Sequence, residues 1–222
     1  MKTKSKILFV TSLAPLLITA VALIFMDNTV PVHFGLNGTP DRYGSKFEYL
    51  ILPIITLAFY VFWKLFIKFY TKSSTGEVTK VNTNTKTLTI FAIATNVLFG
   101  ILQCILLVIA FISRTNPETT IDMFPLVVYA CSITFIIIGN FLPKTKRNSF
   151  AGVRTAWTKK SDKNWYVANR NAGIAFVISG VLSIITTAIV GGSISIFIML
   201  VITFTALISS YIYSYIKVSK NK

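Results

Sequence analysis

The residue types that could perform chemistry are few in this chain and lie apart from one another. The single histidine, His33, stands in the polar stretch VPVHFGLNGTPDRYGSK, residues 30–46. Both cysteines, Cys104 and Cys131, lie inside apolar runs with no histidine or second cysteine beside them. Catalytic sites and zinc sites need several such groups close together. We therefore predict no catalytic residue, no metal site, no cofactor and no enzymatic activity. His33 is expected to make a hydrogen bond, with a pH sensor or a metal ligand as open alternatives.

The composition indicates a membrane protein. Of 222 residues, 54% are hydrophobic and 13% are charged, whereas a soluble domain carries about 25% charged residues. The apolar residues fall in blocks of roughly 20, the length that crosses a bilayer as a helix. Backbone groups in lipid must be paired within their own segment, which favours helices over strands. We predict six transmembrane helices, at residues 7–26, 49–67, 88–112, 124–142, 173–190 and 194–216.

The placement of Lys and Arg predicts the orientation. All but three of the 22 Lys and Arg residues lie near the termini, between the second and third spans, or between the fourth and fifth spans. The exceptions are Arg42, Lys46 and Arg114. Because cytoplasmic loops carry the excess of Lys and Arg, both termini are predicted to be cytoplasmic and residues 27–48 to be external. The predicted fold class is an all-α, multi-pass protein of the cell membrane. The net charge of +15 is thereby explained without nucleic acid as a partner, and membrane lipids are expected neighbours.

The beginning of the chain allows one alternative. Lysines at positions 2, 4 and 6, an apolar run and the triplet Ala20-Val21-Ala22 resemble a cleavable signal peptide. The apolar run continues to Met26, beyond that triplet. A retained first span is therefore preferred.

Two stripes of polar or small residues lie inside the predicted spans. Asn96, Gly100 and Gln103 share one face of the third span. A second stripe recurs every four residues along the fifth: Ala175, Ser179, Ser183, Thr187 and Gly191. Small residues let helices approach closely, and amides hydrogen-bond between helices. Packing is the preferred interpretation, and a polar cavity that accepts a ligand stays open. The stripe of Asn96, Gly100 and Gln103 is the main support for the alternative function of a small-solute transporter or channel, although no charged residue lies near the middle of the membrane.

The external segment is expected to be ordered. Pro31 favours an extended Val30, and Asn37-Gly38 supplies a turn. Pro40 argues against a regular second strand after that turn, so we expect a compact, turn-rich cap.

The segment 143–171 is also more than a basic linker. Ser161 is suited to cap a helix that leads into the fifth span. Trp157 and Trp165 are suited to anchor the segment at the level of the lipid headgroups, and a protein-docking role is the alternative.

These two segments resemble known membrane families. The stretch at residues 30–46 resembles the motif of the DUF1648 family, a membrane domain of unknown function. Residues 139–173, GNFLPKTKRNSFAGVRTAWTKKSDKNWYVANRNAG, resemble the signature of the SdpI family: a Gly-Asn pair, an Asn, a Gly-x-Arg-Thr-x-Trp-Thr run and a Trp before the next span. The chain departs from it at Ala156, where many relatives have Pro or a basic residue, and near Asn169 and Arg170, where many have His. The resemblance implies a DUF1648-like part at residues 1–87 and an SdpI-like part at 88–222.

What the SdpI resemblance implies is a bacterial immunity protein of a Gram-positive cell. Such a protein protects the producer of a secreted antimicrobial peptide or protein toxin. It also implies a possible second role, in which the protein holds a cognate transcriptional repressor at the membrane and so transduces a signal. The candidate toxin contacts are Pro31, His33, Phe34, Gly38, Asp41, Arg42 and Tyr43. The candidate docking residues for a regulator are Asn140, Asn148, Gly152, Arg154, Thr155, Trp157 and Trp165.

Overall fold

The computed structural model describes residues 2–74, 77–115, 121–148 and 150–220. Its main elements are six helices: α1 (Lys2–Phe25), α2 (Ile51–Ser73), α3 (Val78–Thr115), α4 (Met123–Phe141), α5 (Asp162–Val190) and α6 (Ile194–Ser219). Each of these six is long and apolar enough to cross a membrane. The prediction of an all-α fold with six spans is therefore confirmed.

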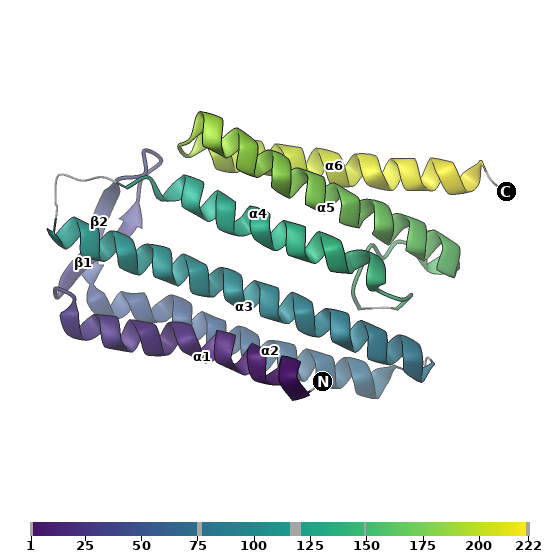
Figure 1. The fold of residues 1–222 in the computed structure, drawn as a ribbon, viewed down its shortest axis with the longest axis horizontal. Coiled ribbons are helices and arrows are strands. Elements are labelled where there is room, and N and C mark those ends of the chain that lie inside the picture. The colour runs from purple at the N-terminus through teal and green to yellow at the C-terminus, as the bar shows by residue number, and fades with distance from the viewer. Residues whose placement is uncertain (1, 75–76, 116–120, 149, 221–222) are drawn as a thin grey trace.

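The helices run up and down in one bundle (Figure 1). Helix α1 packs against α2 and α3, while α5 packs against α4 and α6, and α3 joins the two groups through α4. A β-hairpin lies at one end of the bundle, here called the hairpin end, and the loop of residues 143–161 lies at the other, the loop end. Helix α1 begins and α6 finishes at the loop end. That the loop end is cytoplasmic stays a prediction.

Two helices begin ten residues or more before the spans that hydropathy predicts. Helix α3 begins at Val78 instead of residue 88, and α5 begins at Asp162 instead of residue 173. The added turns are polar and extend past the apolar windows, so a search for lipid-compatible residues does not detect them. The cap of α5 is as predicted, because Ser161 Oγ accepts a hydrogen bond from the Asn164 N–H at 3.1 Å. The boundary proposed at residues 87 and 88 falls within continuous α3, and the division into two parts stays a prediction.

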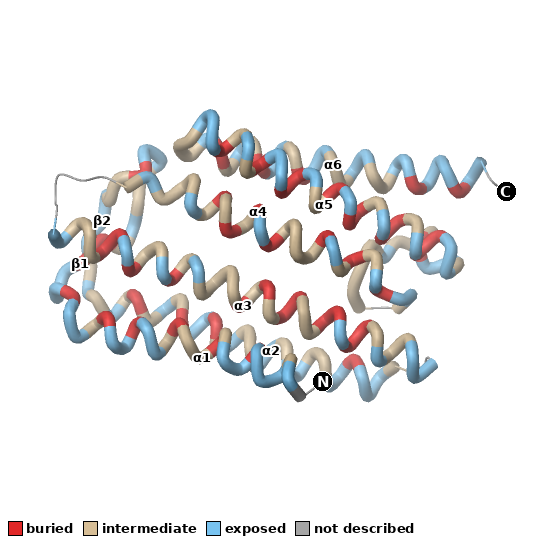
Figure 2. Tube along the Cα trace, viewed as in Figure 1, coloured by how far each residue is buried: buried red, intermediate tan, exposed pale blue. Residues whose placement is uncertain are grey.

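The outer surfaces of the helices are apolar, whereas small and polar residues lie between the helices. Figure 2 shows buried positions recurring along the inward faces of the bundle. Many of them are hydroxyl or amide residues, among them Ser12, Thr19, Thr56, Asn96, Gln103, Ser132, Ser179 and Ser183. Lipid is as apolar as leucine, so helix association here depends on close packing and on hydrogen bonds between helices.

Helices α4 and α5 approach each other closely at glycine residues. A Cβ atom added at Gly173 would lie 2.6 Å from the carbonyl oxygen of Gly139, and a Cβ at Gly139 would lie 2.6 Å from that of Gly173. Two turns further along α5, a Cβ atom at Gly180 would lie 2.7 Å from the carbonyl oxygen of Ser132. Only glycine permits this backbone separation at positions 139, 173 and 180. The predicted stripe at Ala175, Ser179, Ser183 and Thr187 is buried on the same helix.

Candidate functional site: the hairpin end and the loop end

The external segment folds into an antiparallel β-hairpin. Strand β1 (Thr29–Phe34) pairs with β2 (Pro40–Ser45). The sequence predicted no regular second strand directly after the turn. A second strand is present, but its register with β1 shifts between Pro31 and His33 and again between His33 and Phe34. Pro40 is the first residue of an edge strand, a position where its missing N–H removes no essential ladder bond. The turn lies where the Asn-Gly step predicts it, with Gly38 at a φ of +78° and the Gly35 N–H donating to the Thr39 carbonyl at 2.9 Å.

Hydrogen bonds fasten the hairpin to the first three helices. The Tyr49 hydroxyl donates to the Pro31 carbonyl at 2.7 Å. Tyr49 belongs to the short helix η1 (Lys46–Leu50), and its ring packs with Val30 and Leu107 in the core at this end. The Lys46 ammonium donates to the carbonyls of Leu23 at 3.0 Å and of Met26 at 3.3 Å, which are free because α1 ends there. The hairpin is therefore a fixed part of the bundle.

The basic residues at the hairpin end all have structural partners. Lys46 caps the C-terminus of α1, and Arg114 donates to the carbonyl of Phe25 at the same terminus. Arg114 also pairs with Asp27 at 3.3 Å. A cation at a helix C-terminus is stabilised by the helix dipole. These contacts explain why basic residues occur on the side where the charge rule predicts few.

The tip of the hairpin reaches the second half of the chain. Gly38 is buried, and a Cβ atom there would lie 2.8 Å from Oδ1 of Asp122. Asp122 caps α4, since its carboxylate accepts the Phe124 N–H at 3.0 Å. Gly192 lies in the turn between α5 and α6, and a Cβ atom added there would lie 4.0 Å from Oδ2 of Asp122. The hairpin thus crosses the end of the bundle and contacts both groups of helices (Figure 1).

The structure divides the seven hairpin candidates by exposure. Pro31 and Gly38 are buried, Phe34 is half-buried, and the other four are exposed: His33, Asp41, Arg42 and Tyr43. His33 Nδ1 lies 2.5 Å from Asp41 Oδ1, so the histidine has the expected hydrogen bond. Within the described residues no group of three His, Cys, Asp or Glu side chains could hold a metal ion. Sequence reasoning missed Leu36 and Phe47, two large apolar side chains that are exposed at this end.

The polar stripe of α3 faces α1. Asn96 Nδ2 donates to Ser12 Oγ at 2.5 Å, and Gln103 Nε2 donates to Thr19 Oγ1 at 2.9 Å. Between them a Cβ at Gly100 would meet the Pro15 ring at 3.3 Å. Hydrogen bonds between membrane helices contribute about 0.6 kcal/mol each on average. The structure therefore uses the stripe in helix packing, which removes the main support for a transporter.

One cleft brings together candidates from the hairpin and from the stripe. Pro31 and Arg42 of the hairpin, Glu48 and Tyr49 of η1, and Gln103 of α3 line it. Its volume is about 260 Å³, and its remaining walls are apolar: Val32, Ile51, Leu52, Ile55 and Leu106. An ion pair between Arg42 and Glu48, at 3.0 Å, lies on its polar side. We call this space the hairpin cleft. No sequence pattern joins its members, because they come from four separate elements.

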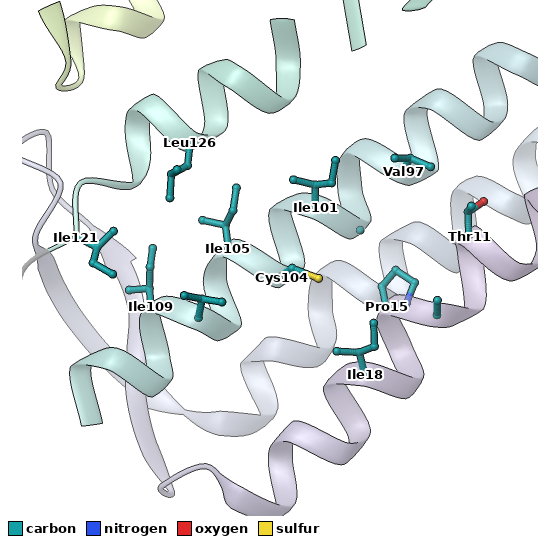
Figure 3. Close-up of a pocket in the computed structure, with 13 residues that line it drawn as sticks. Thr11, Pro15, Ile18, Val97, Ile101, Cys104, Ile105, Ile109, Ile121 and Leu126 are labelled. Atoms are coloured by element: carbon teal, nitrogen blue, oxygen red, sulfur yellow. The ribbon is translucent and has the colours of Figure 1, made fainter. Parts of the chain in front are cut away.

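A second, larger hollow lies at the seam between the two groups of helices. It has a volume of about 470 Å³ and runs between α1, α3 and α4. Figure 3 shows Pro15 and Ile18 of α1, Cys104 and Ile105 of α3, and Leu126 of α4 along it. Its lining is apolar throughout, apart from Thr11 and the thiol of Cys104. Such a surface is compatible with lipid chains and has no polar group that could orient a ligand.

At the loop end, the family-motif residues hold the loop in shape. Asn148 accepts the N–H groups of Phe150 at 2.7 Å and Ala151 at 2.8 Å. Gly152 has a φ of +111°, and a Cβ there would lie 2.5 Å from Oδ1 of Asn169. That same oxygen accepts the Val153 N–H at 2.8 Å. Position 152 therefore requires glycine for two reasons, the positive φ and the lack of space for a side chain.

A second set of contacts ties the loop to α6. Thr155 and Thr158 exchange hydrogen bonds with each other's backbone, at 2.8 Å and 3.2 Å. The Tyr211 hydroxyl donates to Thr155 Oγ1 at 3.2 Å. The Trp157 ring lies edge-on to Tyr211 and Tyr215, with ring centroids 6.0 Å and 5.4 Å away. These aromatic rings form the base of the loop.

Trp165 does not lie where the sequence predicts. It is buried, and its indole N–H donates to the Thr145 carbonyl at 2.9 Å. It therefore packs beneath the loop and is no headgroup anchor, because it lies in the first turn of α5 and its ring faces inward. Among the other candidates Arg154 is exposed, and Asn140 is exposed with its amide donating to the Ile136 carbonyl at 2.8 Å.

Sequence reasoning also missed Asn84, a buried residue of α3. Its side chain donates to the Tyr70 hydroxyl at 2.9 Å and accepts the Lys146 N–H at 2.7 Å. It thereby joins α2 and α3 to the loop. Its position in a polar stretch, VNTNTK, offers no signal that distinguishes it from its neighbours.

These features define a class: a six-helix membrane protein with a folded hairpin at one end and a folded basic loop at the other. Two regions of the chain match family models. Residues 144–214 match the SdpI/YfhL protein family, and residues 10–57 match the domain of unknown function DUF1648. Both resemblances drawn from the motifs are confirmed, and the chain combines a DUF1648 region with an SdpI/YfhL region. The SdpI/YfhL match suggests a membrane protein of the immunity type.

Other comparisons add little. An uncharacterized protein of Archaeoglobus fulgidus is 57% identical over 30 residues, which are 14% of this chain and 16% of that protein. The match therefore spans a small fraction of that relative. No solved structure matches the chain.

Proposed function

We propose that this protein gives a bacterium immunity to a secreted membrane-active peptide or protein toxin, by binding the toxin at the hairpin end. The observation that carries the proposal is the hairpin itself, a fixed cap that contacts both groups of helices. The predicted orientation places this cap on the outer face of the cell membrane, where a secreted toxin arrives. The SdpI/YfhL match supports the same function.

The exposed surface of the cap suits a toxin that partitions into membranes. It presents apolar and aromatic side chains at Leu36, Tyr43 and Phe47 beside the His33–Asp41 pair. Exposed ion pairs contribute little free energy, so the aromatic and apolar side chains are the expected anchors. Binding there would sequester the toxin before it disrupts the bilayer.

Replacing an anchor tests this proposal. In a toxin-sensitive strain that expresses the protein, Tyr43→Ala is expected to lower the tolerated toxin concentration by about tenfold, because tyrosine is enriched among the minority of interface residues whose truncation costs more than about 1 kcal/mol. Killing curves measure the effect, with membrane protein levels matched by immunoblotting. Tyr166→Ala is the control, because Tyr166 is 53% exposed at the loop end and Tyr43 is 58% exposed at the hairpin end. Unchanged killing with and without the wild-type protein, for every toxin tried, would remove the proposal.

A second role, toxin-dependent capture of a cytoplasmic repressor, is favoured by the folded loop. Its basic side chains at Arg154, Lys159 and Lys160 are exposed on a loop that Trp157 and Thr155 tie to α6. A regulator with an acidic surface would be attracted to this end. We expect toxin to recruit a labelled repressor to membranes that contain the protein, and Arg154→Ala to reduce that recruitment several-fold. Recruitment that is absent in the wild type would discard this role and leave immunity untouched.

A further inference from the structure

The hairpin cleft contains a buried acceptor that lacks a partner among the described residues. Gln103 is 1% exposed and lines the cleft. Its Nε2 donates to the Tyr49 carbonyl at 3.1 Å. A carbonyl only accepts, so the amide orientation is determined, and Oε1 is the group left without a hydrogen bond. An unsatisfied acceptor in an apolar site favours a ligand that brings a donor.

The mouth of the cleft favours a ligand without net charge. Arg42 and Glu48 lie on its polar side and neutralise each other at 3.0 Å. Gly44 makes this pair possible, because a Cβ atom there would lie within the space that the Glu48 carboxylate occupies. This pair therefore offers a charged ligand no net opposite charge, whereas a neutral ligand can bind with the pair left in place.

The walls and the depth of the cleft favour an aromatic ring. Val32, Leu52 and Leu106 supply an apolar lining, and the volume of about 260 Å³ accommodates a ring system but no helix. The cleft lies where α2 begins and the hairpin meets the bundle, which is the level of the membrane interface. Indole rings concentrate at that level because one part is apolar and the N–H is polar.

We propose that the hairpin cleft binds a neutral aromatic side chain with a single hydrogen-bond donor, the indole of a tryptophan, presented by a peptide at the hairpin-end face. Gln103 Oε1 is covered in the free protein, so a small shift of its amide admits the indole N–H as a donor, and the ring packs against Leu52, Ile55 and Leu106. That the peptide is the toxin rests on the proposed function; binding of the indole itself does not.

Two probes that differ at one atom test the donor. N-acetyl-tryptophanamide and its benzothienylalanine counterpart share shape and apolarity, but sulfur replaces the ring N–H. With the full-length protein in lipid nanodiscs, saturation-transfer NMR is expected to show the indole probe binding about tenfold more tightly, because a site built to hydrogen-bond discriminates against a ligand that lacks the donor. Empty nanodiscs provide the background that partitioning into lipid alone produces. Equal binding of the two probes to the protein would overturn the proposal.

A matched pair of variants locates the site. Ile55 lines the cleft and is 39% exposed, and Ile101 lines the apolar groove of Figure 3 and is 38% exposed. Ile55→Trp fills the cleft and is expected to abolish the preference for the indole probe, whereas Ile101→Trp should retain it. Persistence of the preference in Ile55→Trp would overturn the assignment. These measurements involve no toxin, so they are independent of the proposed function. If the protein protects cells but does not prefer the indole probe, only the cleft ligand is refuted. If it prefers the indole probe but does not protect cells, only immunity is refuted.

Discussion

Gly173→Ala is expected to lower the free energy of unfolding by about 2 kcal/mol, the balance of an overpacking cost of about 3 kcal/mol and a smaller gain in helix propensity. The added methyl would lie 2.6 Å from the Gly139 carbonyl oxygen and 2.8 Å from Cδ of Pro143. Neither neighbour is the end of a flexible side chain, so α4 and α5 must separate. Alanine favours a helix over glycine by about 1 kcal/mol, which offsets only part of this cost. Denaturation of the purified protein in mixed detergent micelles, followed by tryptophan fluorescence, measures the change.

Gly100→Ala is the matched control, because Gly100 also lies at a helix interface within the membrane. Its Cβ would meet only the Cγ atom of Pro15, at 3.3 Å. The proline ring can adjust its pucker and the gain in helix propensity offsets the tight contact, so the variant should be no less stable than the wild type. If Gly173→Ala and Gly100→Ala proved equally stable, the close approach of α4 and α5 would be wrong. Gly139→Ala should reproduce the loss, since it closes the same contact from the other helix.

Asn169→Leu is expected to open the loop of residues 143–161 while leaving the bundle folded. Leucine has a similar size but cannot accept the Val153 N–H, which Asn169 Oδ1 now does at 2.8 Å. A buried donor without a partner costs about 1–3 kcal/mol, and local opening takes up that cost where the structure is weakest. In nanodiscs, trypsin cleavage at Arg154, Lys159 and Lys160 should accelerate by about tenfold or more.

The control for this experiment is the same substitution two residues further along α5. The Asn171 side chain bonds to α6 instead of the loop, because its Nδ2 donates to Ser214 Oγ at 2.8 Å. Asn171→Leu should therefore weaken the bundle slightly and leave the rate of loop cleavage near that of the wild type. Equal protection of the loop in wild type and Asn169→Leu would show that Asn169 does not hold it.

Local features of the sequence were sufficient for several predictions. The six spans follow from apolar runs of the required length, and the Ser161 cap and the Asn37-Gly38 turn follow from the chemistry of the residues at those points. Each depends on a short stretch of chain. Pro40 shows where such rules stop: proline disfavours the interior of a sheet, but the pairing of β1 with β2 makes position 40 the start of an edge strand.

The candidate site required long-range contacts that no local rule supplies. Gln103 was recognised as a polar residue of a helical stripe, and Arg42 as part of an external motif. That both line one cleft depends on the way the hairpin folds back over α2 and α3. Trp165 resembled an interfacial anchor because tryptophan commonly is one, yet its place in the first turn of α5 directs it beneath the loop.

Local patterns in the sequence were sufficient to predict six membrane spans, the positions of the two ordered polar segments, and the families those segments resemble. Hydropathy, charge placement and turn chemistry act over one helix or one turn, so they can be read without knowing which parts of the chain meet. The folded structure was needed to show that Gly139 meets Gly173, that the motif residues of the loop bond mainly to one another and to α5 and α6, and that the hairpin contacts both groups of helices. These contacts join residues far apart in the chain, and their strength depends on fits of a few tenths of an ångström that composition does not encode.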